Sequence, residues 1–312
     1  MSLFERIAIV GLGLLGGSLG LGAKSRGVVG RVVGATRQVE ARERALRSGA
    51  VDEVLRLEEV ARGAELVVLA TPIHAMPGVL ERMLPGIEDG AIVTDVGSVK
   101  GSVVDTLTGL LPDGVHYVGS HPMAGSHERG MGAARADLFE GAPCVVSGCG
   151  DAAADERVIA FWRGLGAHVV LRDAVRHDAE VAWTSHLPHL LAFAFAHAFG
   201  GAPKTAHEVA GSGFRDFTRI AQSDPELWAD ILTANRKALA APLGALSESL
   251  AAMARAVESA DGESLEALLA SARTNLFRAS LPPTAGETSH SKNPSSPIEG
   301  ETQPGDRSTP HE

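Results

Sequence analysis

Short apolar runs alternate with helix-length amphipathic segments over the first half of the chain. The runs are rich in β-branched residues, and several are apolar throughout, as strands covered on both faces of a sheet tend to be. The expected strands are Arg6–Val10, Arg31–Ala35, Glu65–Ala70, Ala91–Val96, His116–Gly119, Pro143–Ser147 and His168–Leu171. The helical patterns between them include Leu14–Ser25, Val39–Ser48, Met76–Leu84 and Ala153–Leu165. This alternation predicts an α/β fold built on a parallel, doubly wound sheet.

The pattern changes after about Asp173. Strand-like runs stop, and Ala- and Leu-rich segments predict an all-helical second domain in which residues 178–200 form one long apolar helix. Another helix is expected to begin where Asp224, a capping residue, precedes Pro225. From Leu281 onward, Pro, Ser, Thr, Gly and Glu predominate, which predicts a disordered tail. The expected division is therefore 1–173, 174–280 and 281–312.

The composition excludes several classes of protein. With 45% hydrophobic and 21% charged residues the chain has an ordinary globular mix, so it is not disordered as a whole. Its 38 acidic and 28 basic residues give a net charge of -10, with no Lys/Arg run, which argues against nucleic-acid and anionic-membrane partners. The two cysteines, Cys144 and Cys149, are not spaced as C-x-x-C, which argues against a disulfide scaffold and a zinc ribbon.

No targeting segment or membrane span is expected. The N-terminus lacks the basic flank, long apolar stretch and cleavage site of a signal peptide. The most apolar later segment, around Leu187–Phe199, is interrupted by Pro188 and two histidines and is shorter than the roughly 20 residues that cross a bilayer. These features, with the sparse cysteines, indicate a cytoplasmic protein.

A glycine-rich turn follows the first predicted strand. The segment GLGLLG is G-x-G-x-x-G, placed directly after an apolar strand and opening a helix. In a Rossmann-type domain the first glycine permits the tight turn, the second lets the backbone approach a pyrophosphate, and the third lets the helix pack on the strand. The helix start offers free N–H groups to the anion. The predicted cofactor-binding residues are Gly11, Gly13, Leu14, Leu15 and Gly16, although a purely structural turn is the alternative.

The end of the second strand bears on the choice of cofactor. A carboxylate about 20 residues beyond the turn usually holds the ribose 2′-OH of NAD, but Thr36 and Arg37 stand in that region. A hydroxyl and a guanidinium suit the 2′-phosphate of NADP, although a solvated loop arginine is also compatible with the pattern. We therefore expect NAD(P), with NADP slightly favoured, and we include Thr71, just after the strand at 65–70, in the cofactor site.

Further motifs give the chain a family resemblance. They are DVGSVK at 95–100, GSHPMAGS at 119–126, SHLPH at 185–189 and GFRDFTRIA at 213–221. With the glycine-rich turn, this ordered set resembles the prephenate/arogenate dehydrogenase family of tyrosine biosynthesis over about residues 5–280. The resemblance implies NAD(P)-linked oxidative decarboxylation of prephenate to 4-hydroxyphenylpyruvate and CO2, with arogenate to tyrosine as the alternative. It also implies an N-terminal nucleotide domain and a helical domain that forms a homodimer, with the active site between them.

The same resemblance assigns catalytic and substrate-binding residues. His121 matches the family's catalytic histidine, and an imidazole with a pKa of about 6.5 is a suitable base near neutral pH. Ser98 matches a residue that hydrogen-bonds the 4-hydroxyl side of the substrate. Arg219 matches an arginine that holds a substrate carboxylate, a contact that suits a guanidinium. Arg215, four residues earlier, is expected to share its helical face, although an ion pair with Asp216 is equally compatible.

Two histidines in the helical domain are also candidates. His186 and His189 are three residues apart and are expected to share one face of a helix, where they would hydrogen-bond the substrate. Histidines that are simply buried in the helical core are the alternative. No third ligand is suitably spaced, so no metal is expected. Ser126 is included among the substrate-binding residues. Trp228 matches a family tryptophan near the pocket or is a packing aromatic, and His127 stands where some family members carry Glu.

Two other functions compete with this interpretation. A β-hydroxyacid-type dehydrogenase of the same architecture would need a catalytic lysine in the helical domain, but Lys204 and Lys237 lie in no matching motif. A non-catalytic nucleotide sensor would have no need for His121 together with Ser98 and two arginines. The predicted partner is therefore a small-molecule substrate, either prephenate or arogenate.

Overall fold

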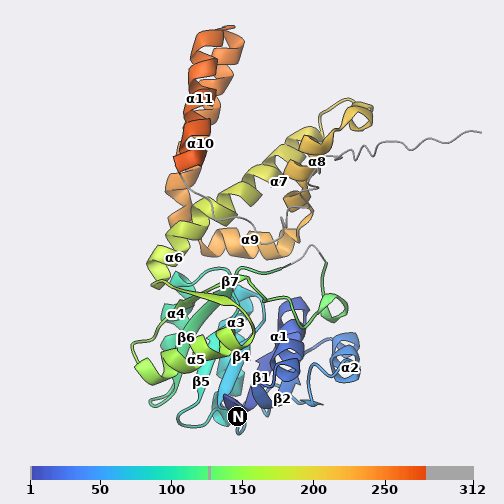
Figure 1. The fold of residues 1–312 in the computed structure, drawn as a ribbon, viewed down its shortest axis with the longest axis vertical. Helices are drawn as coiled ribbons and strands as arrows, with labels where there is room; N and C mark the ends of the chain where they lie inside the picture. Colours follow the sequence, from blue (N-terminus) through green and yellow to red (C-terminus); the bar gives the residue numbers. More distant parts are fainter. Residues whose placement is uncertain (1, 126–127, 279–312) are drawn as a thin grey trace, which may run out of the picture.

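The computed structural model describes residues 2–125 and 128–278 and has two parts. A sheet covered by helices forms the first part, and an all-helical part lies on one edge of it (Figure 1). The fold class predicted from the sequence is confirmed. The predicted tail at 281–312, the last residue of the GSHPMAGS motif, Ser126, and the following His127 lie outside the described residues.

Eight strands form one sheet in the order β3-β2-β1-β4-β5-β6-β7-β8. Alternate residues of β1 face opposite sides, since Ile7 and Ile9 belong to one apolar core while Ala8 and Val10 belong to the other. Because β1, β2, β4 and β5 pair in parallel, their carboxyl ends meet at one edge, where open α/β sheets bind ligands. The strands are β1 Phe4–Val10, β2 Val29–Ala35, β3 Glu53–Val54, β4 Leu66–Leu69, β5 Ile92–Asp95, β6 His116–Pro122, β7 Pro143–Ser147 and β8 His168–Leu171.

Helices cover both faces of the sheet. Buried residues of α1, α2 and α5 join one core, and those of α3 and α4 join the other. The helices of the first part are α1 Leu14–Ser25, α2 Val39–Arg47, α3 Met76–Met83, α4 Gly101–Thr108 and α5 Ala152–Gly164. Those of the second part are α6 Ala174–Val181, α7 Leu187–Phe199, α8 Ser212–Thr218, α9 Pro225–Ala234, α10 Arg236–Glu258 and α11 Gly262–Arg278. Among these helices none combines the length and hydrophobicity that a bilayer crossing needs.

The helical part docks on the sheet through α9, which lies across the edge of the sheet domain in Figure 1. Trp228 and Ile231 of α9 belong to the same buried cluster as Ile73 of the sheet domain. Asp224 caps α9 by accepting a hydrogen bond from the Glu226 N–H at 2.9 Å, as the sequence predicts. The hairpin of α10 and α11 projects away from the body as an arm (Figure 1).

The sheet is not parallel throughout, which corrects the prediction. β7 runs antiparallel to β6, with Gly119 opposite Ser147 and His121 opposite Val145. A parallel neighbour needs a crossover connection that carries the chain back along the sheet. Within the described residues between β6 and β7, the only helical element is the short turn Met131–Ala133, so the chain returns in the opposite direction.

The predicted single helix at 178–200 is also wrong, because it breaks at a π-helical turn. α6 ends at Val181, the turn spans Ala182–His186, and α7 begins at Leu187. Pro188 has no N–H, and its ring would clash with the carbonyl of residue 184 in a continuous α-helix. Such π-turns are frequent at functional sites, and this one ends on a candidate histidine.

Candidate active site

The glycine-rich turn has the shape of a phosphate cradle. Gly11 has φ +101°, and a Cβ there would lie 2.3 Å from the Ala70 carbonyl oxygen. A Cβ on Gly16 would lie 1.9 Å from the Gly11 carbonyl oxygen, so α1 packs on the turn only with glycine here. A Cβ on Gly13 would meet no heavy atom within 4 Å, which leaves open space in front of the α1 N-terminus. The three glycines thus fit the roles that a bound pyrophosphate requires.

The first N–H groups of α1 lack partners within the helix. Gly13 is the N-cap residue and offers no side chain, and the first backbone bond of the helix runs from the Gly17 N–H to the Gly13 carbonyl at 2.9 Å. The N–H groups of Leu14, Leu15 and Gly16 are therefore left for a ligand. A helix N-terminus with free N–H groups favours an anion.

The neighbouring strand ends supply the remaining cofactor candidates. Thr36 follows β2 and accepts a hydrogen bond from the Gln38 N–H at 3.3 Å, while Arg37 is exposed and forms no ion pair with any described residue. Thr71 follows β4, and its backbone nitrogen lies 3.2 Å from the Cβ position of Gly11. The Thr71 hydroxyl is buried and has no hydrogen-bond partner in the described structure. An unpaired buried hydroxyl beside the cradle is consistent with a ligand contact.

His121 lies within β6 rather than beyond it, which corrects the predicted strand end at Gly119. The residue is only 6% exposed, and antiparallel pairing with β7 holds its backbone. Its Nδ1 lies 2.8 Å from His177 Nε2, and His177 Nδ1 lies 2.8 Å from Asp178 Oδ1. We refer to His121, His177 and Asp178 as the His–His–Asp triad. Sequence reasoning missed the last two members, because nothing in their spacing links them to His121.

The triad fixes which nitrogen of His121 is free. Burial raises the pKa of Asp178, but hydrogen bonds from His177 and from the backbone N–H groups of Lys100 and Gly101 outweigh it and leave the pKa below its usual range. Ionised Asp178 therefore accepts from His177 Nδ1–H, and His177 Nε2 accepts from His121 Nδ1–H. The lone pair of His121 is then on Nε2. This is the tautomer that a base needs, held from the opposite side of the ring.

The pKa of His121 predicts the acid limb of the pH–rate profile. Burial, followed by the charges of His177, Lys100 and His186, holds this pKa well below the usual 6.5. A base must be neutral, so with His121 in the role predicted from its motif, activity should be present above the folded-state pKa and be lost as pH falls through it. We expect kcat/KM to stay constant from pH 8 through pH 6.5 and to fall only below that, which initial rates across pH 5–8 would measure. Half-loss at pH 6.5 or above would contradict the assignment.

A buried ion pair supports the strand that carries His121. Lys100 and Asp95 form it with both side chains fully buried. Asp95 Oδ1 also accepts from the Tyr117 hydroxyl at 2.8 Å and from the Ser120 N–H at 3.0 Å. The Lys100 ammonium is therefore committed to Asp95 and is not placed to bind a phosphate. Ser98, in the same loop, is half-buried, and its hydroxyl makes no hydrogen bond to any described residue.

Trp228 brings the two predicted histidines of the helical part together. The His189 ring stacks on the indole with centroids 3.6 Å apart, and the His186 ring meets it edge-on at 6.1 Å. His189 Nδ1 lies 2.9 Å from the Ser185 carbonyl, so this N–H donates to the preceding turn. No group of three His, Cys, Asp or Glu side chains in the described ranges is arranged to hold a metal ion.

The two predicted arginines differ in their surroundings. The turn Arg219–Gln222 packs against α7, the helix that carries His189. Burial lowers the pKa of His189, the hydrogen bond to the Ser185 carbonyl opposes this, and the charge of Arg219 adds to it. Arg215 instead donates to the Ala210 carbonyl at 2.8 Å. Arg215 lies in the last turn of α8, and Arg219 is the C-cap of that helix and begins a 3₁₀ turn.

Comparison with known proteins identifies the family. A model of the prephenate dehydrogenase nucleotide-binding domain matches residues 19–171, and a model of the prephenate dehydrogenase dimerization domain matches residues 173–271. The chain belongs to the prephenate dehydrogenase family. The first match begins at residue 19, beyond the glycine-rich turn, so the link between that turn and cofactor binding rests on its geometry.

Curated relatives and solved structures agree with this family. The chain is 36% identical over 276 residues to the cyclohexadienyl dehydrogenase of Zymomonas mobilis, which covers 85% of the chain and 92% of that protein. It is 36% identical over 247 residues to the prephenate dehydrogenase of Bacillus subtilis, covering 74% of the chain and 64% of that longer protein. A crystal structure of A. aeolicus prephenate dehydrogenase with hydroxyphenyl propionate and NAD+ superposes with TM-score 0.80 at 27% identity, covering 88% and 98% of the two chains.

Family membership makes the chain a nicotinamide-dependent oxidoreductase of the prephenate dehydrogenase type. The resemblance drawn from the motifs is thus confirmed. Lys204 and Lys237, the two lysines of the helical part and the candidates for the catalytic lysine of a β-hydroxyacid-type enzyme, are both exposed.

Proposed function

We propose that this chain oxidises and decarboxylates prephenate to 4-hydroxyphenylpyruvate and CO2 with NAD(P), and that His121 is its base. The observation that carries the proposal is the His–His–Asp triad, which presents a neutral imidazole near the cofactor edge of the sheet. Arogenate, which carries an amino group in place of the side-chain keto group, is the alternative substrate. The division at 1–173 and 174–280 into nucleotide and substrate domains is part of the same proposal.

The reaction asks the protein mainly for a base and for correct placement of the ring carbon that bears the 4-hydroxyl. The nicotinamide, when bound, accepts the hydride from this carbon. His121 Nε2 takes the hydroxyl proton as the hydride leaves, while His177 and Asp178 hold the ring and stabilise its charged form. Loss of the ring carboxylate as CO2 then leaves its electron pair to the ring, which becomes aromatic, and the 4-oxygen takes its proton back from His121.

The helical part supplies the contacts that hold the substrate. Prephenate carries two carboxylates, and Arg219 is exposed in a turn that packs against α7, the helix that carries His189. A guanidinium can bind a carboxylate through two parallel hydrogen bonds. We assign Arg219 to a substrate carboxylate and the imidazoles of His186 and His189 to further hydrogen bonds. Ser98 is assigned to the 4-hydroxyl, which would satisfy its unpaired side chain.

Replacing Arg219 by alanine should raise KM for prephenate at least tenfold and leave the Kd for NAD(P) unchanged, because it removes a charge-assisted contact to the substrate alone. Steady-state kinetics and cofactor titration would measure both constants. Arg215→Ala is the matched comparison and should have a smaller effect, since its guanidinium already donates to the Ala210 carbonyl. An unchanged KM in Arg219→Ala would remove this residue from the carboxylate site.

We propose that NADP is preferred slightly over NAD. Thr36 and Arg37 follow β2, and the segment 36–39 contains no carboxylate that could pair with a ribose 2′-OH. The first acidic residue beyond it, Glu40, is exposed in the first turn of α2. The exposed Arg37 guanidinium suits a 2′-phosphate, which carries more charge than a hydroxyl.

The variant Arg37→Ala should weaken NADP binding about tenfold and change NAD binding less than twofold, since only the 2′-phosphate contact is lost and a charge-assisted hydrogen bond contributes about 1.5–3 kcal/mol. Fluorescence titration with NADPH and NADH would give both affinities. Arg42, farther along α2, donates to the Val54 carbonyl, so Arg42→Ala provides a control for the loss of a charge nearby. Equal losses for the two cofactors would argue against a 2′-phosphate contact.

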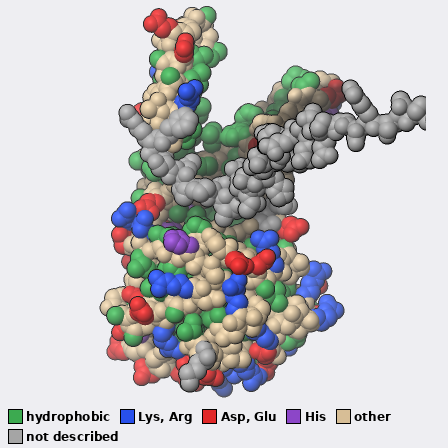
Figure 2. Space-filling model, in the orientation of Figure 1, with side chains coloured by type: hydrophobic (Ala, Val, Ile, Leu, Met, Phe, Trp, Pro, Cys, Tyr) green, Lys and Arg blue, Asp and Glu red, His purple; other side chains and the backbone are tan. Residues whose placement is uncertain are grey.

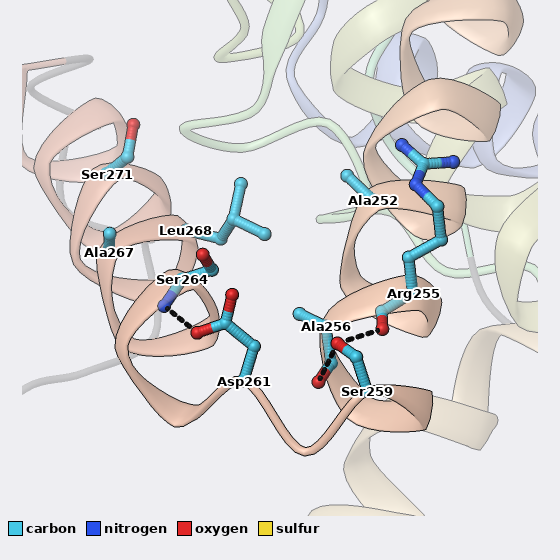
Figure 3. A pocket seen from close by; sticks show the side chains of 9 residues that line it. All are labelled: Ala252, Arg255, Ala256, Ser259, Asp261, Ser264, Ala267, Leu268 and Ser271. Carbon is cyan, nitrogen blue, oxygen red and sulfur yellow. Dashed lines mark hydrogen bonds between the residues drawn. The ribbon is translucent and has the colours of Figure 1, made fainter.

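We further propose that the helical domain forms a homodimer. The arm carries exposed leucine and valine side chains, among them Leu250, Val257, Leu269 and Leu276 at 49%, 63%, 54% and 66% exposure. Figure 2 shows hydrophobic side chains gathered over α7 and the arm. A depression of about 510 Å³ lies between α10 and α11, with Leu268 facing into it (Figure 3). Exposed apolar side chains gathered on one element are typical of a protein interface, and sedimentation should give the mass of two chains.

A rate matrix of two substrates by two cofactors tests the proposed activity. The purified chain should oxidise prephenate with NADP fastest, with NAD slower and with arogenate slower still. CO2 release and the formation of 4-hydroxyphenylpyruvate should match reduced cofactor one to one. A protein that oxidises neither substrate with either cofactor would overturn the proposed function.

A further inference from the structure

Asn235 lies at the junction of α9 and α10 and is only 3% exposed. Its side-chain amide nitrogen lies 2.9 Å from the backbone carbonyl of Asp178 and 2.8 Å from His186 Nδ1. One buried amide therefore contacts both the segment that carries the His–His–Asp triad and a histidine predicted to bind the substrate.

The first of these contacts fixes the orientation of the amide. A backbone carbonyl can only accept, so the Asn235 atom that faces it must be the NH₂ group. That group has two hydrogens, one for the carbonyl and one for the imidazole. His186 Nδ1 must then accept, and in a neutral ring the proton is on Nε2.

The free side of the His186 ring is left unpaired. His186 is fully buried, and its Nε2 has no hydrogen-bond partner among the described residues. Burial, only partly opposed by the charge of Asp178, lowers the pKa of this ring to about 4, so it is neutral at pH 7. The ring meets Trp228 edge-on, beside the stacked His189. A buried N–H without an acceptor is unfavourable, and native structures keep few such groups outside functional sites.

We propose that Asn235 is a positioning residue that holds His186 in its Nε2–H tautomer, so that this nitrogen donates to an acceptor oxygen of the bound substrate. The proposal rests on the proposed function for the identity of the substrate. It does not rest on that function for the tautomer. Asn235 touches no reacting atom and acts only through His186.

A purely structural role for Asn235 makes a different prediction. The residue also connects α6 to the α9–α10 junction, and loss of that connection alone would lower the melting temperature. If Asn235 had only this structural role, it would not determine the tautomer of His186 in the unmodified chain. The effect of replacing Asn235 on ligand binding would then not depend on whether His186 is present. The tautomer and this dependence are therefore the quantities to measure.

The first measurement uses the unmodified protein. Nitrogen NMR of the chain with ¹⁵N-labelled imidazoles distinguishes Nε2–H from Nδ1–H rings, and His186→Ala assigns the signal. We expect neutral Nε2–H for His186 from pH 8 to pH 6. An Nδ1–H ring would overturn the proposal, and this result needs neither turnover nor a folded Asn235 variant.

The second measurement uses Asn235→Asp, whose carboxylate accepts where the amide donates. We expect His186 to carry a proton on Nδ1 in this variant and the Kd of 3-(4-hydroxyphenyl)propionate, measured by calorimetry with NAD(P) present, to rise at least tenfold. Asn275 is an exposed asparagine on α11, so Asn275→Asp is the matched control and should change Kd less than twofold. A changed tautomer with an unchanged Kd would overturn the donor role.

The third measurement tests whether Asn235 acts through His186. In a His186→Ala background, Asn235→Asp should weaken the probe by less than a further twofold, whereas independent effects would multiply. Effects on Kd that multiply would overturn the proposal. A His186→Ala variant that binds the probe with normal Kd would also overturn it. This second outcome can be measured even if the Asn235→Asp variant does not fold. If His186 is in the Nε2–H tautomer but the protein oxidises neither prephenate nor arogenate, only the proposed function is overturned.

Discussion

The variant His121→Asn should lower kcat by about 10³-fold, within the range usual for loss of a general base. Asparagine can still hydrogen-bond His177 at the same position, but it cannot take a proton from the substrate hydroxyl. The Kd for NAD(P) should change less than twofold, because the cofactor cradle is built from the turn after β1 and not from β6. Steady-state kinetics with prephenate and fluorescence titration with the reduced cofactor would measure the two effects.

His116→Asn is the matched control for this variant. His116 begins the same strand, is partly exposed, and lies 4.0 Å from Asp151 rather than near the triad. We expect its kcat to stay within twofold of the unmodified protein. If His121→Asn weakened the cofactor as strongly as it lowered kcat, the loss would lie in cofactor binding and His121 would not be the base.

The second large effect is expected for Gly13→Val, which should weaken NAD(P) binding at least 100-fold while leaving the melting temperature almost unchanged. A Cβ at this position would meet no atom of the protein within 4 Å, so we expect the fold to accommodate a side chain here. It would occupy the space in which a pyrophosphate approaches the backbone. Fluorescence titration and thermal unfolding of the same samples would separate binding from stability.

Two other glycines provide controls for this prediction, one for cofactor binding and one for stability. Gly78 on α3 likewise has no atom within 4 Å of its Cβ position, so Gly78→Val should keep normal cofactor affinity. Gly16→Ala should lower the melting temperature, because its Cβ would lie 1.9 Å from the Gly11 carbonyl oxygen. If Gly13→Val bound NAD(P) within threefold of normal, the cofactor site would not be at this turn.

Local sequence patterns were sufficient to predict the sheet, the first helices and the glycine-rich turn. Apolar β-branched runs mark the central strands because both of their faces are buried, and the cap at Asp224 depends on neighbouring residues only. The reversal of β7 was not predicted, because strand direction depends on the connection between strands rather than on the strand itself. The two-residue strand Glu53–Val54 is too short to leave a pattern.

The candidate site was predicted less completely, because its contacts join distant parts of the chain. His121 was identified through its motif, but its partner His177 is 56 positions away, and Asn235 is 57 positions from Asp178. Hydrophobic periodicity reports which face of an element is buried and not which polar groups meet there. The π-turn before Pro188 could have been anticipated, since a proline excludes a regular helix at that point.

The anchoring of Asp178 has a consequence for how this enzyme can be divided or recombined. Its carboxylate accepts from the backbone N–H groups of Lys100 and Gly101 at 2.7 and 2.8 Å, at the start of α4 in the sheet domain, although Asp178 itself belongs to α6 of the helical domain. His121 and the two side chains that orient it therefore come from different domains. A chimaera that joined this nucleotide domain to a foreign helical domain would inherit the cofactor cradle and His121, but it would lose the tautomer of that histidine unless the His177-Asp178 pair were grafted with it.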